Sequence, residues 1–366
     1  MDGSLPLSTT GRRSRARAAT AGEGGRRAAF PFSAIVGQEE LKLALQLAVV
    51  EPALGGVLAF GDRGTGKTTA IRALAAVMPP LRTVEGCRFV CDPAAPEDLC
   101  HDCRARACAE GLRVVERPAP VVDLPLGATE DSLLGALDLE QALAHGRRVF
   151  QPGLFARAHR GFLYVDEVNL LEDHLVDLLL DVSASGENAV EREGLSVRHP
   201  ARFVLVGSGN PEEGELRPQL IDRFGLCVEV RTPTALSDRV EILKRRDAYE
   251  REPARLAAAW ASAEGALRDR LALARVRVAG VSAPDAVLAD AAQLCMALGS
   301  DGLRAELTLV RAARALAALE GRRRVARDDL RRVAPMALRH RLRRDPLDES
   351  DAGARVARAL VEAWGP

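Results

Sequence analysis

Short runs of apolar residues alternate with helical patterns in the first two thirds of the chain. Val57–Phe60 is an uninterrupted apolar run, typical of a strand buried on both faces of a sheet. It leads into a glycine-rich stretch, after which residues 67–77 suit a helix that ends before the proline pair at 79–80. Upstream, apolar residues recur at helical spacing over residues 38–50. This order predicts a helix followed by a strand–loop–helix unit.

Two further apolar runs, at 162–165 and 203–206, predict strands that each end in polar residues. Strands of this kind favour a parallel sheet that carries its chemistry at the strand ends. Between them, residues 175–182 predict a helix, and residues 189–197 predict a hairpin that turns at Glu193-Gly194. The expected fold class is α/β, with a parallel sheet sandwiched by helices.

From about residue 237 the strand signals vanish, and Ala/Leu/Arg segments with helical spacing follow. Breaks between these segments are expected near Pro253, Gly280, Pro284, Gly299, Gly321 and Pro346. We therefore predict a C-terminal α-helical bundle domain. The expected division is a leader at 1–29, an α/β domain at 30–235 with an insertion at 81–120, and the helical domain at 236–366.

Composition narrows the class of protein. A chain of 366 residues with 47% apolar and 28% charged residues is in the globular range, which excludes a wholly disordered or collagen-like protein. It has no run of about 18 apolar residues, so no transmembrane helix is expected. We see no secretory signal in residues 1–29 and expect a cytoplasmic protein. This leader carries six arginines and is interpreted as a disordered basic tail, with a nucleic-acid arm or an organelle-targeting peptide as alternatives.

The glycine-rich stretch matches the phosphate-binding pattern G-x-x-x-x-G-K-[ST] between a strand and a helix. Glycines turn successive amide N–H groups toward one point, where the helix dipole adds positive potential. Lys67, one of only three lysines, would neutralise the β and γ phosphates, and the Thr68 hydroxyl would ligate Mg²⁺. The residues expected to hold the nucleotide phosphates are Gly61, Asp62, Arg63, Gly64, Thr65, Gly66, Lys67, Thr68 and Thr69.

Hydrolysis needs a second set of groups beyond the phosphate cradle. Asp166 and Glu167 follow the apolar run at 162–165, where Asp166 would hold the magnesium ion and Glu167 would deprotonate water. Asn210 follows the next predicted strand and has a side chain that could reach the attacking water. An Asn before proline is also ordinary turn chemistry, and by itself that interpretation is favoured.

This ordered set resembles the AAA+ ATPases, and longer segments resemble the I subunit of magnesium chelatase in particular. The resemblance runs from about residue 30 to the end and is carried by residues 32–38, 61–68, 123–127, 166–171, 207–214, 220–225, 300–304 and 340–348. It implies a AAA+ P-loop domain with a helical lid, and an ATPase that works within an ATP-dependent metal–porphyrin ligase.

The resemblance also assigns roles that spacing does not give. It implies that Ile35 and Val36, in the segment that ends at Gln38, border the adenine. Asn210 would be the first sensor, and Arg304 the second sensor, contributed by the helical domain. Arg223 resembles the arginine finger that is presented to the nucleotide of an adjacent subunit. Without the family match, surface salt bridges would be the favoured interpretation of Arg223 and Arg304.

The implied assembly is a homo-oligomeric, hexameric ATP-driven ring that works with a D subunit and with an H subunit that holds protoporphyrin IX and inserts Mg²⁺. Only two Trp and two Tyr are available to stack on a macrocycle, so no porphyrin pocket is expected in this chain. The alternatives are the motor of a cobalt chelatase or a MoxR-type ATPase that matures another metalloenzyme. A nucleic-acid-binding scaffold is a further alternative, but no helix-turn-helix segment favours it.

Five of the seven cysteines lie in the insertion, as Cys87, Cys91, Cys100, Cys103 and Cys108. Their spacing is C-x3-C-x8-C-x2-C-x4-C, which leaves three interpretations open: a structural Zn²⁺ site, reduced thiols or a redox pair, and an iron–sulfur centre. Many related sequences lack these thiols. Cys227 and Cys295 stand alone in apolar segments and are expected to pack as small apolar groups.

Overall fold

A five-stranded parallel sheet forms the centre of the computed structural model, which describes residues 28–62, 64–145, 149–192, 195–210, 218–300, 302–342 and 352–365. The strand order is β11-β1-β10-β7-β4, and every pairing is parallel. These strands are β1 (Val57–Phe60), β4 (Val121–Leu124), β7 (Phe162–Val165), β10 (Val204–Gly209) and β11 (Leu226–Glu229).

Six further strands form two-stranded antiparallel ladders beside the main sheet. They are β2 (Leu81–Val84) with β3 (Val114–Arg117), β5 (Gly135–Leu137) with β6 (Phe150–Pro152), and β8 (Glu187–Arg192) with β9 (Leu195–Pro200). The β8–β9 ladder confirms the predicted hairpin, although its turn at 193–194 lies outside the described residues.

Helices surround the sheet and make up most of the described chain from residue 236 onward. In the first part of the chain they are α1 (Glu39–Val50), α2 (Lys67–Val77), α3 (His101–Ala109), α4 (Glu130–Leu134), α5 (Leu139–His145), α6 (Leu154–Ala158), α7 (Asp173–Ser185) and α8 (Pro218–Ile221). In the second part they are α9 (Leu236–Arg251), α10 (Pro253–Arg277), α11 (Asp285–Ala297), α12 (Arg304–Leu319), α13 (Arg327–Leu338) and α14 (Ala352–Trp364).

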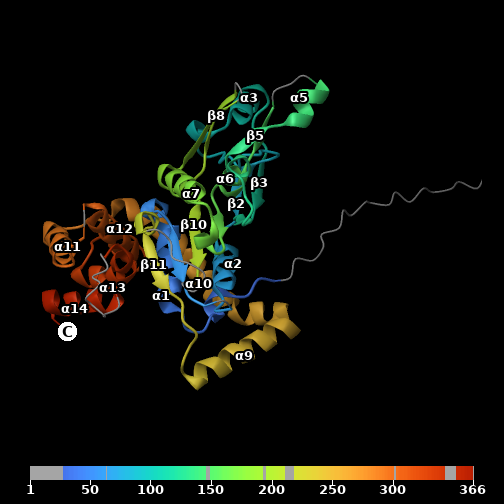
Figure 1. Ribbon diagram of the computed structural model, residues 1–366. Coiled ribbons are helices and arrows are strands. Elements are labelled where there is room, and N and C mark those ends of the chain that lie inside the picture. The colour runs from blue at the N-terminus through green and yellow to red at the C-terminus, as the bar shows by residue number, and fades with distance from the viewer. Residues whose placement is uncertain are drawn as a thin grey trace, which may run out of the picture.

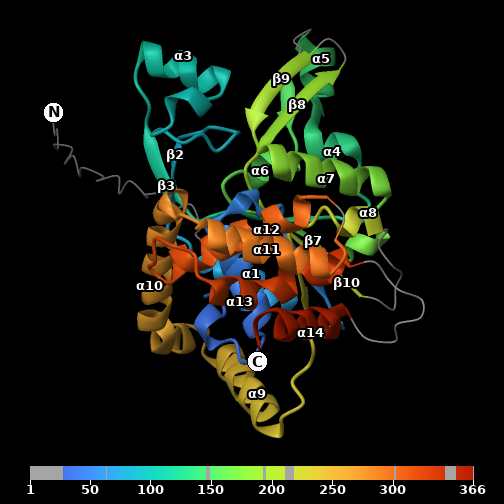
Figure 2. The ribbon, with the colours of Figure 1, turned by 90° about the vertical axis from the view of Figure 1, so that its left-hand side faces the viewer.

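The alternation of side chains along the strands separates two cores, one on each face of the sheet. Phe162 and Tyr164 of β7 pack into the core that also contains α1, α2 and the helices from α10 onward. Leu163 and Val165, on the opposite face, pack with α6, α7 and the insertion. Figures 1 and 2 show α3 and α9 at opposite ends of the molecule, with α11 to α14 grouped beside the sheet.

Most of the predicted elements are confirmed, but several observed elements were not predicted, among them β5, β6 and the helices α4 to α6. The edge strands β4 and β11 were not predicted, and the insertion contains the β2–β3 ladder and α3 although its sequence shows no periodicity. The expected division at 235/236 stays a prediction, and nearly all of the basic leader lies outside the described residues. Within the described ranges, no helix has the length and apolar content needed to cross a bilayer.

The close approach of Gly225 to the end of the 3₁₀ turn Pro52–Leu54 yields a test of this packing. A Cβ atom at residue 225 would lie 1.8 Å from the Leu54 carbonyl oxygen, so Gly225→Ala should lower the free energy of unfolding by roughly 1–3 kcal/mol. Urea unfolding would measure this. Gly265 of α10 is the control, because nothing lies within 4 Å of its Cβ position. Gly265→Ala should be stabilising by about 0.5–1 kcal/mol, and equal effects of both changes would contradict the packing argument.

Candidate functional site

The loop between β1 and α2 has the backbone shape of a phosphate cradle. Gly61, Gly64 and Gly66 have φ values of 147°, 78° and 87°, a region that favours glycine. Gly61 is further fixed because a Cβ there would lie 2.0 Å from the Val230 carbonyl oxygen. The loop ends where α2 begins at Lys67, so free amide groups and the positive end of the helix dipole meet at this place. Arg63, another predicted phosphate ligand, lies outside the described residues.

Lys67 lies within the cradle that it is predicted to complete. Its side chain is buried, and Nζ donates hydrogen bonds to the carbonyl oxygens of Gly61 at 2.5 Å and Asp62 at 3.0 Å. Thr65 stabilises the same turn, since its hydroxyl donates to the Asp62 carbonyl at 3.0 Å. Thr69, another of the predicted phosphate ligands, lies in the first turn of α2. A cationic group therefore lies at the concave side of the loop, where an oligophosphate would meet it.

A hydroxyl network joins the phosphate loop to the predicted metal-binding carboxylate. The Thr68 hydroxyl donates to Tyr164 Oη at 3.0 Å, and Tyr164 donates to Asp166 Oδ1 at 2.9 Å. Ser208 of β10 also donates to Asp166, and its oxygen accepts the backbone N–H of Glu167 at 3.2 Å. Burial raises the pKa of Tyr164 above its usual value, so the tyrosine remains a neutral donor at physiological pH.

Thr68 and Asp166 therefore offer hard oxygen ligands on the two sides of one tyrosine. Asp166 is exposed, so its carboxylate is open to solvent on the side away from Ser208 and Tyr164. A hydroxyl and a carboxylate in this arrangement suit Mg²⁺, which prefers oxygen ligands and keeps several waters. The residues present therefore fit a magnesium ion that accompanies a bound nucleotide.

The carboxyl ends of three neighbouring strands bring the remaining predicted groups to the same edge. Glu167 follows β7 with φ 52°, and Asn210 follows β10, which lies between β7 and β1. The Gly61 N–H donates to the Gly209 carbonyl at 3.1 Å, which places the start of the phosphate loop beside the end of β10. Asn210 thus follows the strand that separates the loop from Glu167, and its position directly after a strand agrees with the sequence prediction.

The segment before α1 contacts the phosphate loop through a glutamine. Gln38 donates from its side-chain amide to the Thr65 carbonyl, and it caps α1 with φ 54°. Within the described part of the chain, the other amide atom, Oε1, is buried without a hydrogen-bond partner. Ile35 and Val36 lie just before it and are half-buried. These residues are therefore next to the loop, where they would border the base of a nucleotide.

Arg223 lies at the opposite end of the sheet from its own phosphate loop. It precedes Leu226, which pairs with Val57 at the start of β1, whereas the loop follows Phe60 at the end of β1. At about 3.3 Å per residue, the strand alone separates the two places by about 13 Å. In this chain the guanidinium instead contacts Asp177 at 2.8 Å and Asp181 at 3.1 Å, both on α7.

Arg304 lies at the same end of the sheet as Arg223. Its guanidinium donates to Asp222 Oδ2 at 3.0 Å, and Arg341 donates to Asp222 Oδ1 at 3.0 Å. Arg341 is nearly buried and also donates to the Phe224 carbonyl at 2.8 Å. Burial and the neighbouring Arg341 hold the pKa of His340 at about 3, so this histidine is neutral beside the arginines. The structure therefore groups the two predicted arginines together and brings neither to its own phosphate loop.

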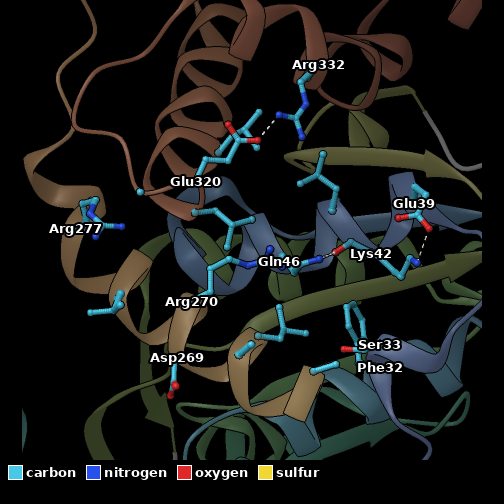
Figure 3. Close-up of a pocket in the computed structure, with 18 residues that line it drawn as sticks. Phe32, Ser33, Glu39, Lys42, Gln46, Asp269, Arg270, Arg277, Glu320 and Arg332 are labelled. Atoms are coloured by element: carbon cyan, nitrogen blue, oxygen red, sulfur yellow. Dashed lines mark hydrogen bonds and ion pairs between the residues drawn. The ribbon is translucent and has the colours of Figure 1, made fainter. Parts of the chain in front are cut away.

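A cavity of about 1120 Å³ lies elsewhere, between α1, α10 and the α12–α13 pair. None of the described phosphate-loop residues lines it. Its charged side chains largely pair with one another, as Lys42 does with Glu39 and Arg332 with Glu320, while Arg270 donates to Gln46 (Figure 3). Cationic side chains that are already paired with carboxylates have little charge left for a phosphate. The lining therefore favours a solvated groove, and this cavity is not the nucleotide site.

Four of the five predicted cysteines of the insertion form a cluster, while the fifth does not. Cys87, Cys91, Cys100 and Cys103 are buried, and their sulfur atoms all lie within 4.8 Å of one another. Cys108 is exposed and outside this group. Cys227 and Cys295 are buried among apolar residues, as the sequence predicts.

Four polar residues of the site were not singled out from the sequence: Tyr164, Ser208, Asp177 and Asp181. The signal for Tyr164 is strand alternation, since it lies two residues before Asp166 and therefore faces the same side. Asn169 is a further candidate for a polar residue of the site. Within the described residues, both of its side-chain amide atoms are buried and have no hydrogen-bond partner.

Curated relatives match most of this chain. The model for the family "Magnesium chelatase, subunit ChlI" matches residues 138–219, and the model for the AAA lid domain matches residues 288–360. A magnesium-chelatase 38 kDa subunit from Acidiphilium rubrum is 67% identical, covering 91% of this chain and 97% of its own length. One from Cereibacter sphaeroides is 61% identical, with coverages of 91% and 98%.

A solved structure shows the same relationship. It is a cryo-EM-based complex between the subunits BchI and BchD of magnesium chelatase, in which the matching chain is 57% identical with a TM-score of 0.53. The match covers 90% of the present chain and 100% of that one.

The hydroxyl network around Tyr164 yields a test of the metal site. Tyr164→Phe removes the link between Thr68 and Asp166, so the Mg²⁺ concentration for half-maximal nucleotide hydrolysis should rise about 5–10-fold, as expected for about 1 kcal/mol of lost hydrogen bonding. Titration of hydrolysis against Mg²⁺ measures this. Tyr249→Phe is the matched control, because that hydroxyl donates to the Ala28 carbonyl instead. An unchanged magnesium requirement in Tyr164→Phe would contradict the proposed role of the network.

Proposed function

Because this chain belongs to the family of magnesium-chelatase ChlI subunits, we propose that it is the ATP-hydrolysing motor that drives insertion of Mg²⁺ into protoporphyrin IX by a separate subunit. The observation that carries the proposal is the continuous network from the phosphate loop, through Thr68, Tyr164 and Asp166, to the backbone of Glu167. Phosphate binding, metal binding and water activation are thereby held in one rigid arrangement.

In this proposal each residue near the carboxyl ends of β1, β7 and β10 has one role in ATP hydrolysis. Lys67 exchanges its loop carbonyls for the β and γ phosphates of ATP, while the loop amides hold the remaining phosphate oxygens. Thr68 and Asp166 hold the magnesium ion of MgATP, which when bound supplies positive charge to the phosphates. Glu167 takes a proton from water, and its position is fixed by the bond from its backbone to Ser208. Asn210 orients that water from the adjoining strand.

Arg223 and Arg304 act on a neighbouring subunit rather than on their own nucleotide. The parallel register places Arg223 at the end of the sheet that lies away from the chain's own loop, and the contact with Asp222 holds Arg304 at the same end. A ring in which this end faces the next subunit's loop would use both arginines. An arginine aimed at the γ-phosphate stabilises charge in the transition state and contributes about 10³–10⁵ in rate in other nucleotidases. Asp177 and Asp181 would then hold Arg223 in the unassembled chain. We propose a homo-oligomeric, hexameric ring on this ground and on the family resemblance.

The porphyrin and its metal are assigned to partners, namely the D and H subunits of magnesium chelatase. The aromatic side chains of this chain support the assignment. Tyr164 is used in the hydroxyl network, Tyr249 packs against Phe30, and Trp260 and Trp364 lie under Arg245 and Arg327. None of these four large aromatic residues lines the 1120 Å³ cavity. The solved BchI–BchD complex supports a D-type partner in the same way.

The test of the function is reconstitution with D and H subunits of a related chelatase. Protoporphyrin IX, MgCl₂ and ATP should give magnesium porphyrin, followed by its fluorescence, only when this chain and both partners are present. Lys67→Ala should abolish both nucleotide binding and product, because the phosphate charge is then uncompensated. Cobalt is offered in parallel reactions. ATP turnover without any magnesium insertion, or insertion of cobalt alone, would overturn the assignment.

The shared site is tested by complementation between two inactive variants. Lys67→Ala has a defective cradle and an intact Arg223, whereas Arg223→Ala has the opposite defect, and each alone should lose at least about 10³-fold in ATP hydrolysis. Mixed rings contain interfaces with an intact cradle and an intact arginine, so hydrolysis should return to a sizeable fraction of the wild-type rate. Steady-state ATPase assays of the mixture at varied ratios measure it.

Arg231→Ala is the control for the loss of a surface arginine, because Arg231 contacts only Glu229 of its own β11 among the interactions described. Arg231→Ala should keep wild-type turnover. When it is mixed with Lys67→Ala, the mixture should not exceed the activity of the Arg231→Ala protein that it contains. A mixture of Lys67→Ala and Arg223→Ala that stays as inactive as its components would argue for a catalyst complete within one chain.

A further inference from the structure

We propose that Cys87, Cys91, Cys100 and Cys103 bind one structural Zn²⁺ ion, which holds the insertion in its folded form. This site is separate from the nucleotide site and goes beyond the proposed motor function. Among the described residues these form the only group of three or more His, Cys, Asp or Glu side chains that lie close enough together to hold a metal ion. All four thiols belong to the segment that runs from the end of β2 through the first turn of α3, which the motor chemistry does not use.

The sulfur positions match a tetrahedral site for a single ion. The Sγ atoms of Cys87 and Cys100 are 3.9 Å apart, and all four lie within 4.8 Å of one another. Tetrahedral coordination with Zn–S bonds of about 2.3 Å places neighbouring sulfurs about 3.8 Å apart. A disulfide would need about 2.05 Å. In a four-iron cluster each thiolate binds a different iron, which spreads the sulfurs farther than one ion does.

Hydrogen-bond donors already surround the sulfurs. The backbone N–H of Phe89 lies 3.3 Å from Cys87 Sγ, and that of Cys100 lies 3.2 Å from Cys91 Sγ. The Arg106 guanidinium lies 3.3 Å from Cys103 Sγ. Four thiolates around one divalent ion leave excess negative charge, and such outer donors offset it in metal sites. Two backbone amides and one cation aimed at sulfur are therefore what a tetrathiolate site requires.

The helix that supplies Cys103 contributes only one buried side chain to a core. In α3, a helix of 9 residues, Cys103 is the only buried residue. Isolated helices shorter than about 12–15 residues are marginal in water, and most helices are stabilised by an apolar face. Metal binding supplies folding free energy to small units of this kind. The zinc ion would thus replace the apolar face that α3 lacks.

The loop that carries Cys91 contains a further constraint. Val90 has φ 55°, which is unfavourable for a β-branched residue and persists only where its surroundings fix it. On one side Phe89 packs against Phe150 and His199, so this loop is also anchored to β6 and β9. A metal ion bound by Cys87 and Cys91 would hold the chain on the other side of Val90. The site thus joins the insertion to the β8–β9 hairpin beside it.

Metal analysis of the full-length protein tests the proposal. The chain is produced in medium containing zinc and iron and purified with a reductant and without chelators. Mass-spectrometric elemental analysis should find about one zinc and negligible iron per chain. Replacement by Co²⁺ should give the intense thiolate-to-cobalt charge-transfer bands and the visible bands of a tetrahedral tetrathiolate, a readout that needs no variant. Removal of the metal should abolish hydrogen-exchange protection in residues 101–109 and spare α1.

Cys103→Ser and Cys91→Ser should each reduce the zinc content at least about tenfold, whereas Cys108→Ser, in the same helix but outside the cluster, should keep it. Nucleotide binding is measured on the same samples. Lys67→Ala should keep its zinc, and Cys103→Ser should bind nucleotide within about twofold of wild type, so the two proposals fail separately. Stoichiometric iron, a disulfide among these cysteines, or wild-type protein without metal and with all its thiols free would overturn the zinc assignment.

Discussion

The parallel register of the central sheet is the constraint on which the rest of this structure depends. The carboxyl ends of parallel strands all lie on the same side of the sheet. The phosphate loop after β1, the carboxylates after β7 and Asn210 after β10 therefore lie close together without any long connection. The same register places the segment before β11, which contains Arg223, at the amino ends of the strands. The parallel register therefore brings the candidate phosphate-site residues together and also keeps Arg223 away from them.

How far the sequence predicts this fold depends on where each strand lies in the sheet. The three central strands, β1, β10 and β7, have neighbours on both sides, and their apolar runs are recognisable in the sequence. Within this sheet, the two strands that were not predicted, β4 and β11, are its edge strands. Each includes an acidic residue, Asp123 or Glu229, which an edge position tolerates because one side of the strand is open. Local hydrophobicity cannot distinguish such a strand from a loop.

The candidate site divides in the same way. Lys67, Asp166 and Glu167 could be found because the spacing of a motif encodes them, and Arg223 and Arg304 because of a family resemblance. Ser208 and the α7 carboxylates could not, and strand alternation alone points to Tyr164. The importance of all these residues comes from contacts between residues 2 to 96 positions apart. The cysteine spacing left the grouping open as well, and only the folded insertion separates Cys108 from the other thiols.

The hydrogen bonds of Lys67 to its own loop have a thermodynamic consequence for ligand capture. The amine ties two carbonyls of the turn together before any ligand is bound, so we expect little chain entropy to be lost when a nucleotide binds. The heat released on association is then a difference between two sets of polar contacts, carbonyls given up and phosphate oxygens gained. Calorimetry of this protein would therefore report that exchange rather than the full strength of a new ion pair.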